Sequence, residues 1–284
     1  MSSKKRGRDR ELEAGSRAHF EDPAYYAQSY AKRRDDVAYY VRVAQGQPSV
    51  LEYGIGSGRV ALPIARAGSR VVGIDLSEPM LGDLARRLAK EPREVRGRVI
   101  ARQGDMREVR LRERFPLVIC PFNAALHLYT REDVEAWLAR VREHLAPKGE
   151  LVVDISMPIL EDLSDPPGTE YALPSFVHPS AGPVKYREVF DYDRVRQISF
   201  CSMVFEPKKQ PSFMVPLAHR QFFPQEWEAL LHYNGFDATA VYGDFEGNPL
   251  VQSSDVMVWH ARRSSRSAVR GAARPRGERR RASR

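Results

Sequence analysis

The sequence is poor in cysteine and contains no long apolar run. Only Cys120 and Cys201 occur among 284 residues, too few for a disulfide framework, which favours a reducing, cytoplasmic setting. No apolar segment reaches the roughly 20 residues of a membrane-spanning helix. The charged residues 1–10 lack the apolar core of a secretory signal. Internal repeats, metal-ligand clusters and a Gly-x-Ser-x-Gly elbow are also absent from the sequence. We therefore expect a globular, cytoplasmic protein with no membrane partner and no resident metal.

Positive charge is concentrated at the two ends of the chain. The formal net charge is +8, but residues 262–284 alone contribute +9 and residues 1–19 contribute +3, which leaves about −4 for the rest. Both ends are rich in Arg, Ser, Gly and Ala and lack apolar periodicity, so the sequence predicts two basic, disordered tails. A solvated tail is the favoured interpretation, and nucleic-acid binding through the tails is the alternative.

A glycine-rich turn between a strand and a helix organises the middle of the chain. A short apolar run leads into Glu-Tyr-Gly-Ile-Gly-Ser-Gly-Arg, residues 52–59, and a helical pattern follows. Glycine at Gly54, Gly56 and Gly58 allows a tight turn and lets the backbone approach a ligand. Because Arg59 stands where a dinucleotide-binding motif has its third glycine, the spacing disfavours a nicotinamide-dependent reductase.

An acid, Glu52, lies two residues before the first of these glycines. The order Glu-x-Gly-x-Gly-x-Gly resembles the first motif of class I S-adenosylmethionine-dependent methyltransferases. In that family the loop holds the aminocarboxypropyl end of the cofactor. The resemblance implies that Glu52 and the three glycines bind S-adenosylmethionine.

The second predicted strand, residues 70–75, ends in another acid. Asp75 follows the glycine loop by about 20 residues, where nucleotide-binding α/β folds carry a ribose-binding carboxylate. The phrase Asp-Leu-Ser-x-x-Met-Leu then resembles the second motif of the family. This resemblance implies that Leu76 and Met80 lie against the adenosine, although Met80 is also compatible with simple core packing.

The third predicted strand, residues 98–102, leads into Asp105 and Met106. In the family, an acid at this place binds the adenine amino group, and the backbone of the next residue meets the ring. A turn-forming or capping role for Asp105 is the alternative.

The fourth predicted strand, residues 116–120, leads into a segment with candidate catalytic side chains. Ligands of open parallel sheets bind outside the carboxyl ends of the strands. The segment resembles the Asn-x-x-x-His-Leu segment of small-molecule methyltransferases, and it is not the Asn-Pro-Pro-Tyr type of enzymes that methylate nucleic-acid bases. The resemblance implies that Pro121 contacts the cofactor and Phe122 the acceptor, with Asn123 and His127 as the catalytic residues. A structural histidine is the alternative at position 127.

Aromatic residues at helical spacing follow a predicted helix start at Asp22-Pro23, within residues 20–45. They indicate either an amphipathic helix packed on the domain or a lid whose rings cover the sulfonium ion and exclude water. Small-molecule methyltransferases often place a tyrosine-bearing helix there, so Tyr25 and Tyr30 are candidate cofactor contacts.

An insertion follows the fifth predicted strand, residues 150–155. Residues 157–182 are rich in proline and resemble a loop, whereas three later segments alternate apolar and polar residues as antiparallel strands do. We expect a small sheet that caps the active site. Its candidate inward polar groups are Tyr186, Arg187, Arg196, His219 and Arg220, of which Tyr186 and Arg220 are the predicted acceptor ligands.

Together the patterns predict an α/β protein with a Rossmann-like class I methyltransferase sheet, mostly parallel with an antiparallel final strand, over residues 20–261. Residues 156–223 form the inserted antiparallel β cap, and residues 1–19 and 262–284 form the tails. The expected reaction moves a methyl group to a nitrogen or oxygen of a small-molecule acceptor. The overall pattern is similar to amino-sugar N-methyltransferases, and the lack of an obvious acid–base pair favours nitrogen. The alternatives are an RNA- or protein-directed methyltransferase, or an RNA-binding protein that uses the tails.

Overall fold

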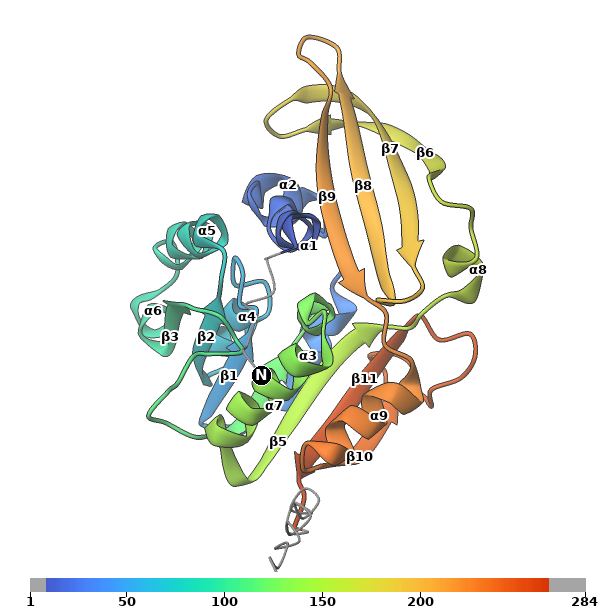
Figure 1. Cartoon of the computed structure of the whole chain (residues 1–284). Helices are drawn as coiled ribbons and strands as arrows, with labels where there is room; N and C mark the ends of the chain where they lie inside the picture. Colours follow the sequence, from blue (N-terminus) through green and yellow to red (C-terminus); the bar gives the residue numbers. More distant parts are fainter. Residues whose placement is uncertain (1–8, 266–284) are drawn as a thin grey trace, which may run out of the picture.

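The computed structural model describes residues 9–265 and contains two sheets (Figure 1). The larger sheet has seven strands in the order β10-β11-β5-β4-β1-β2-β3. These strands are β1 (Ser49–Tyr53), β2 (Arg70–Asp75), β3 (Val99–Gln103), β4 (Phe115–Cys120), β5 (Leu145–Ser156), β10 (Phe236–Tyr242) and β11 (Val256–Arg263). Strands β1 to β5 pair in parallel, and β11 runs antiparallel to both β5 and β10. The predicted sheet, with an antiparallel final strand, is confirmed.

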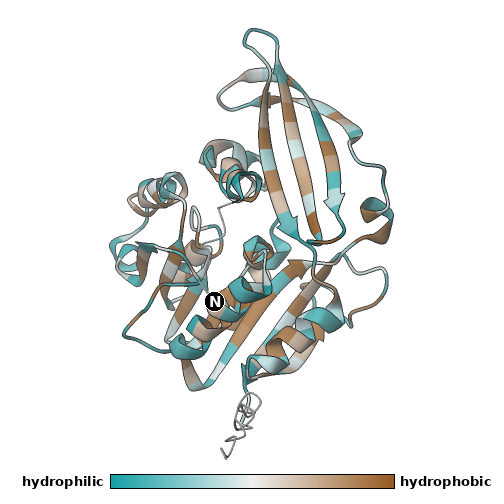
Figure 2. Cartoon of the chain, in the orientation of Figure 1, coloured by the Kyte–Doolittle hydropathy of each residue, from teal (hydrophilic) through white to brown (hydrophobic). Residues whose placement is uncertain are grey.

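Two hydrophobic layers pack against the two faces of this sheet. Successive strand residues alternate between the layers, as in β1, where Val50 packs in one cluster and Leu51 in the other. One layer includes buried residues of α3 (Asp35–Ala44), α4 (Ala61–Arg66), α5 (Glu78–Leu88) and α6 (Arg93–Arg98). The other includes residues of α7 (Arg131–His144) and α9 (Pro224–Tyr233). The brown strands between partly teal helices in Figure 2 show the same arrangement.

Strand β1 lies at the point where the sheet reverses its winding order. Its neighbours are β2 on one side and β4 on the other. Loops that leave such neighbouring strands at their carboxyl ends separate and open a crevice, which is the usual ligand position in open α/β sheets. The glycine loop leaves β1 at this crevice.

The smaller sheet is antiparallel, extends beyond the end of β5 and is called the cap here (Figure 1). Its strands are β6 (Thr169–His178), β7 (Gly182–Asp193), β8 (Ile198–Pro207) and β9 (Phe213–Arg220). The inserted antiparallel sheet is therefore confirmed. The prediction of a loop over residues 157–182 is wrong, because this stretch contains the short helix α8 (Leu160–Leu163) and the edge strand β6. Most β6 side chains are exposed, so the strand lacks the apolar alternation that marks a half-buried strand.

The segment before β1 is more ordered than the sequence predicts. It contains α1 (Arg10–Gly15), the 3-10 helix η1 (Ala18–Phe20), α2 (Pro23–Ser29) and α3. The expected disordered tail over residues 1–19 is therefore wrong for residues 9–19. Asp9 caps α1 and binds Arg196 of the cap at 2.7 Å, and Gly15 packs so closely on Ala218 that an added Cβ would lie 2.6 Å from the Ala218 Cβ. Residues 1–8 and the predicted tail beyond residue 265 lie outside the described residues.

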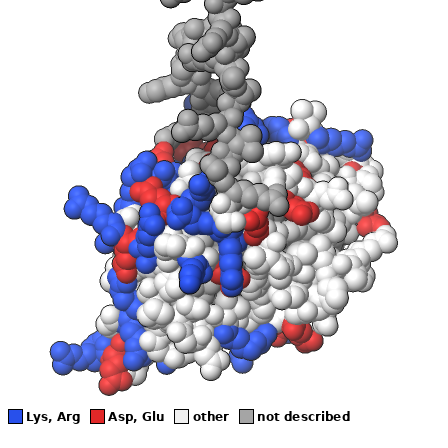
Figure 3. Space-filling model, turned by 90° about the horizontal axis from the view of Figure 1, so that it is seen from below, with Lys and Arg blue, Asp and Glu red and all other residues white. Residues whose placement is uncertain are grey.

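Acidic groups accompany the basic side chains of the large-sheet domain. Viewed from the side opposite the cap, Lys and Arg are interspersed with Asp and Glu (Figure 3). Several arginines form ion pairs, namely Arg66 with Glu91, Arg70 with Glu113 and Arg110 with Glu143. Over residues 9–265, no helix is long and apolar enough to cross a membrane.

Candidate functional site

The glycine loop needs glycine for both its conformation and its packing. Gly54, Gly56 and Gly58 have φ angles of +75°, +52° and +81°, which side-chain-bearing residues rarely adopt. A Cβ at Gly58 would lie 2.5 Å from Leu84 Cδ1, and a Cβ at Gly54 would lie 2.8 Å from the Ala124 Cβ. The backbone is therefore packed against its neighbours without space for a side chain.

Asp75 joins the glycine loop to the end of β2. Its carboxylate accepts hydrogen bonds from the Gly56 N–H at 2.7 Å and from the Ser77 N–H at 2.8 Å. Burial raises the pKa of Asp75, and the backbone donors oppose this shift. Leu76 is 45% exposed beside it, whereas Met80 is buried and packs close to Gly56. The structure thus places three predicted cofactor contacts, Asp75, Leu76 and Met80, beside the glycine loop.

Glu52 is a buried acid with an unused acceptor. Its side chain is 1% exposed, and Oε2 has no hydrogen-bond partner within the described residues. Burial raises its pKa well above the usual range, Arg59 acts in the opposite direction, and Asp75 adds to the rise. A buried acceptor without a partner is costly unless a ligand supplies a donor. Glu52 and the glycine cradle therefore fit a ligand that carries an N–H or O–H group.

The carboxylate of Asp105 forms an ion pair with Arg107. Both of its oxygens accept from the Arg107 guanidinium, at 2.9 and 2.6 Å, and Arg107 also binds Asp133 at 2.6 Å. Burial works against ionisation of Asp105, but Arg107 outweighs it and holds the pKa of this carboxyl below its usual range. Met106 packs against the hydrophobic cluster under the sheet. Oδ1 of Asp105 also accepts from the Arg107 backbone N–H at 2.8 Å, and Oδ2 accepts from Arg107 Nε at 3.1 Å, so Arg107 engages both carboxylate oxygens.

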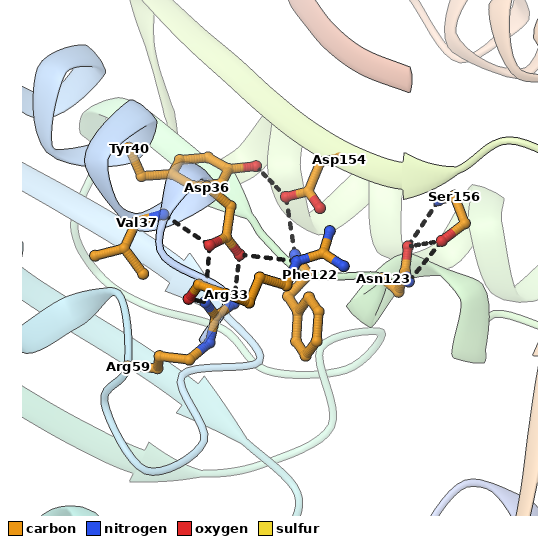
Figure 4. A network of polar contacts seen from close by, with 9 residues as sticks. All are labelled: Arg33, Asp36, Val37, Tyr40, Arg59, Phe122, Asn123, Asp154 and Ser156. Atoms are coloured by element: carbon orange, nitrogen blue, oxygen red, sulfur yellow. Dashed lines mark hydrogen bonds and ion pairs between the residues drawn. The ribbon is translucent and has the colours of Figure 1, made fainter. Parts of the chain in front are cut away.

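The turn after β4 adopts an unusual backbone held by polar contacts (Figure 4). Phe122 and Asn123, which follow the buried Pro121, have φ angles of +56° and +62°. Asp154 Oδ1 accepts from the Phe122 N–H at 2.8 Å and from the Tyr40 hydroxyl at 2.6 Å. The Asn123 amide donates to Ser156 Oγ at 2.8 Å, and its oxygen accepts from the Ser156 N–H at 2.7 Å. Asn123, a predicted catalytic residue, is thus used to fix the turn.

Two arginines lie against the ring of Phe122 (Figure 4). The guanidinium carbons of Arg33 and Arg59 are 4.7 and 4.4 Å from the ring centroid. Arg59 also binds the fully buried Asp36 through two hydrogen bonds, at 2.9 and 2.6 Å. This pair ties the start of α3 to the glycine loop. The sequence analysis did not find it, because no local pattern connects residue 36 with residue 59.

The predicted tyrosine contacts separate into two groups. Tyr25 is buried in the hydrophobic cluster of the cap, where it stacks on His178 with ring centroids 4.7 Å apart. Tyr30 lies against Phe122, with centroids also 4.7 Å apart. Tyr26 was not proposed as a site residue, yet it lies within electrostatic reach of Arg59 and Asp75, and burial raises its pKa. The structure therefore places Tyr26 and Tyr30, and not Tyr25, beside the glycine loop and the β4 turn.

His127 belongs to a group of histidines that come from different parts of the chain. Its Nδ1 lies 3.2 Å from the Tyr129 hydroxyl, and its ring centroid is 5.0 Å from that of His219 on β9. Burial, assisted by nearby His19, lowers the pKa of His127 to about 4. Among residues 9–265, no group of three or more His, Cys, Asp or Glu is placed to hold a metal ion.

The two predicted acceptor ligands of the cap have protein partners. The Tyr186 hydroxyl donates to Glu188 at 2.5 Å, and its ring packs in the hydrophobic cluster of the cap. Arg220 donates to Glu226 and to the Gln197 side chain, both at 2.7 Å. Each of these two side chains is therefore already engaged by a neighbouring acid of the protein.

Part of the chain is similar to known methyltransferases. Residues 50–149 match the family described as "Methyltransferase domain". The dTDP-3-amino-3,4,6-trideoxy-alpha-D-glucopyranose N,N-dimethyltransferase of Streptomyces venezuelae is 32% identical over 126 residues, 44% of this chain and 50% of the relative. The dTDP-3-amino-3,6-dideoxy-alpha-D-glucopyranose N,N-dimethyltransferase of Streptomyces fradiae is 31% identical over 126 residues, 44% of this chain and 46% of the relative. The chain thus matches about half the length of these relatives.

A solved structure extends the likeness to the whole fold. The CcbJ methyltransferase from Streptomyces caelestis superposes with a TM-score of 0.75 at 23% identity, over 88% of this chain and 99% of that one. At this identity the likeness concerns the fold alone, and it includes the region of the cap. Residues 50–149 are thus similar to a methyltransferase domain, and the chain shares the fold of the CcbJ methyltransferase.

Proposed function

We propose that the protein is an N-methyltransferase that uses S-adenosylmethionine and acts on a small molecule, with amino sugars as the leading acceptor class. The observation that carries this proposal is the Asp75 carboxylate, anchored by the glycine loop at the carboxyl edge of the sheet. The two relatives named as amino-sugar N,N-dimethyltransferases favour this acceptor class. The β4 turn, without an Asn-Pro-Pro-Tyr motif, disfavours a nucleic-acid base as acceptor.

The residues around the glycine loop offer a partner for the ribose, the adenine and the amino group of the cofactor. Asp75 would accept hydrogen bonds from the ribose hydroxyls, and the exposed side chain of Leu76 would contact the adenine. Asp105 and the Met106 backbone would meet the adenine edge. Glu52 Oε2, buried and without a partner, would accept from the amino group at the other end of the cofactor. When bound, the cofactor supplies a methyl group on a positively charged sulfur.

The aromatic residues exclude water from the reaction, and His127 orients the acceptor. Tyr26, Tyr30 and Phe122 form a wall that excludes water and favours a cation through the faces of its rings. His127 is neutral and accepts a hydrogen bond from the acceptor amine, which orients the nitrogen lone pair for in-line attack. The bound cofactor would supply the methyl group to this lone pair and would retain the electrons of its C–S bond on sulfur. Since a histidine with a pKa of about 4 is a weak base, the proton of the product ammonium passes to water.

Calorimetry with S-adenosylhomocysteine tests the cofactor assignment directly. Asp75→Ala should weaken binding at least about tenfold, the loss expected from a charge-assisted hydrogen bond of about 1.5 kcal/mol. Glu78→Gln, at an exposed acid in the first turn of α5, is the matched control and should leave the affinity unchanged. Equal affinity in a folded Asp75→Ala variant would refute the assignment.

A methylation assay then tests the acceptor class. The wild-type protein is incubated with labelled cofactor and, separately, with a 3-amino-3-deoxyhexose nucleotide, a peptide with a free α-amine and a transfer RNA. Label on the sugar nitrogen supports the proposal. Label only on the peptide or the RNA would replace the amino sugar with that acceptor.

A further inference from the structure

Three histidines from separate parts of the chain meet at one place between the large sheet and the cap. His19 lies on η1, His127 on the 3-10 helix η2 (Ala124–His127) after β4, and His219 near the end of β9. The rings of His127 and His219 have centroids 5.0 Å apart, and His19 acts electrostatically on both. We call these three residues the histidine cluster. Its members are contributed by the N-terminal segment, the methyltransferase sheet and the cap, so it forms only in the complete fold.

Several ring nitrogens of this cluster have no partner. His19 is 4% exposed, its Nε2 contacts the Tyr30 hydroxyl at 3.0 Å, and its Nδ1 is buried without a hydrogen bond in the described part of the chain. The ring of His127 contacts Tyr129 through Nδ1 only, and the ring of His219 forms no hydrogen bond within residues 9–265, although its backbone oxygen accepts from Gln221. Among the ring nitrogens of the cluster, only His19 Nδ1 is fully buried without a partner, which is costly, whereas His127 and His219 are partly exposed and keep free ring nitrogens. These atoms point to a ligand that completes their hydrogen bonds.

The cluster is also electrically neutral. Burial lowers the pKa of His19 and His127 to about 4 and that of His219 well below its usual range. His19 also opposes protonation of His127, and both oppose protonation of His219. In the described residues, no Asp or Glu side chain bonds to any of the three rings. A neutral imidazole offers one N–H donor and one nitrogen acceptor. The cluster therefore presents alternating donors and acceptors without a counterion for a charged group.

We propose that His19, His127 and His219 bind the acceptor and select a neutral amino alcohol, in which the amine nitrogen has a hydroxyl neighbour. This inference rests on the proposed function. A hydroxyl both donates and accepts, and an uncharged amine donates through N–H while its lone pair stays available for the methyl group, so both match neutral imidazoles. An ammonium or carboxylate group beside these rings would find no opposite charge, which is unfavourable where water is partly excluded. His219 and His19 are thus specificity-determining residues beside the predicted His127.

Steady-state kinetics with a 3-amino-3-deoxyhexose nucleotide as probe tests the role of His219. His219→Ala should raise the acceptor KM at least about tenfold and leave the affinity for S-adenosylhomocysteine unchanged. His219→Asn keeps a donor and an acceptor and should recover part of the loss, whereas His219→Leu should not. His178→Ala, which removes a cap histidine outside the cluster, is the matched control for disturbance of the cap. An unchanged acceptor KM in His219→Ala would overturn the proposal.

A second probe tests the neighbouring hydroxyl. The wild-type protein should use the parent sugar at least about tenfold better, in kcat/KM, than an analogue that lacks the hydroxyl next to the amine. This preference should shrink in His219→Ala and in His19→Leu. An equal kcat/KM preference for the parent sugar in the wild type and both variants would show that the histidines do not bind the hydroxyl.

Histidine nitrogen NMR gives a result that does not depend on turnover. In the complex with S-adenosylhomocysteine, addition of the sugar should shift the ¹⁵N signals of the three cluster rings and leave exposed His232 unchanged. If the cofactor product binds and the sugar shifts none of these rings, the acceptor proposal is wrong while the cofactor assignment stands. If no cofactor binds at all, the proposed function and this inference both fail.

Discussion

Replacement of Asp154 by asparagine should change how the stability of the protein depends on pH. Asp154 is fully buried at the end of β5, where Oδ1 accepts from Tyr40 and from the Phe122 backbone, while Oδ2 has no partner among residues 9–265. Burial raises its pKa from 3.8 to about 6, and the Tyr40 hydrogen bond opposes that shift. Asparagine has the same shape and keeps the accepting oxygen, but it does not ionise. The substitution therefore isolates the cost of a buried charge.

The sign and size of the effect follow from proton linkage. Because the folded state holds this proton more tightly than the unfolded state, Asp154 contributes stability that is full below pH 3.8 and lost as the pH rises through about 6. With these two pKa values, the contribution falls by about 1.4 kcal/mol between pH 5 and pH 8. Asp154→Asn lacks this fall. The difference in unfolding free energy, variant minus wild type, should therefore increase by about 1.4 kcal/mol over the same range.

Urea unfolding at pH 5, 6, 7 and 8, followed by tryptophan fluorescence, measures this difference. Other titrating groups are the same in both proteins and cancel in the comparison. Tyr40→Phe provides an independent check, because loss of the hydroxyl removes a donor that favours the ionised form. It should raise the pKa of Asp154 further and extend the loss of stability to higher pH. A variant-minus-wild-type difference that stays constant from pH 5 to pH 8 would refute the reasoning.

Three further changes test the frame of the site. Gly58→Ala should destabilise the protein by about 2 kcal/mol or more in urea unfolding, because Gly58 has a φ of +81° and is closely packed. Gly82→Ala is the control: Gly82 lies within α5, where an added Cβ meets no close neighbour, so the change should stabilise the protein by up to about 1 kcal/mol. Arg59→Leu leaves Asp36 buried without its main partner and should lower the free energy of unfolding by about 3–5 kcal/mol. The additional change Asp36→Asn should recover part of this loss. No recovery would contradict the ion-pair interpretation. Deletion of residues 266–284 should leave methyl transfer to a small acceptor within a few-fold, and loss of turnover in a folded truncated protein would assign these residues to the site.

The glycine loop and the strand ends were predictable because their signals are local. A positive φ at Gly54, Gly56 and Gly58 is a property of the turn itself, and the acid at Asp75 follows at a spacing set by one strand and one helix. The parallel sheet and the antiparallel cap were predicted from residue alternation and from the family resemblance, and both were confirmed. The exposed edge strand β6 was missed because a strand that buries little carries no alternation to detect.

The side chains that complete the site could not be predicted in the same way. On α2, helical spacing marked several tyrosines but not the direction that each faces. Successive helical residues differ by about 100°, so the position of the cap decides that Tyr25 packs with His178 while the next residue, Tyr26, faces the glycine loop. The cap is built from residues more than a hundred positions later in the chain, and no pattern within α2 records where it lies.

The histidine cluster likewise could not be predicted from the sequence, because its residues come from distant parts of the chain. In the sequence, the resemblance of the β4 segment selected His127, and the alternation of the inserted strands marked His219 as a candidate inward polar group. No pattern selected His19. The common property of the three, ring nitrogens without partners and without a neighbouring acid in the described residues, arises because η1, η2 and β9 meet. The proposed cofactor contacts lie on successive strand ends of one sheet, so a sequence motif can carry them. The proposed acceptor contacts come from three separately placed segments. Under this proposal each segment can change without disturbing the cofactor site, and the fold can serve different acceptors while its glycine loop stays the same.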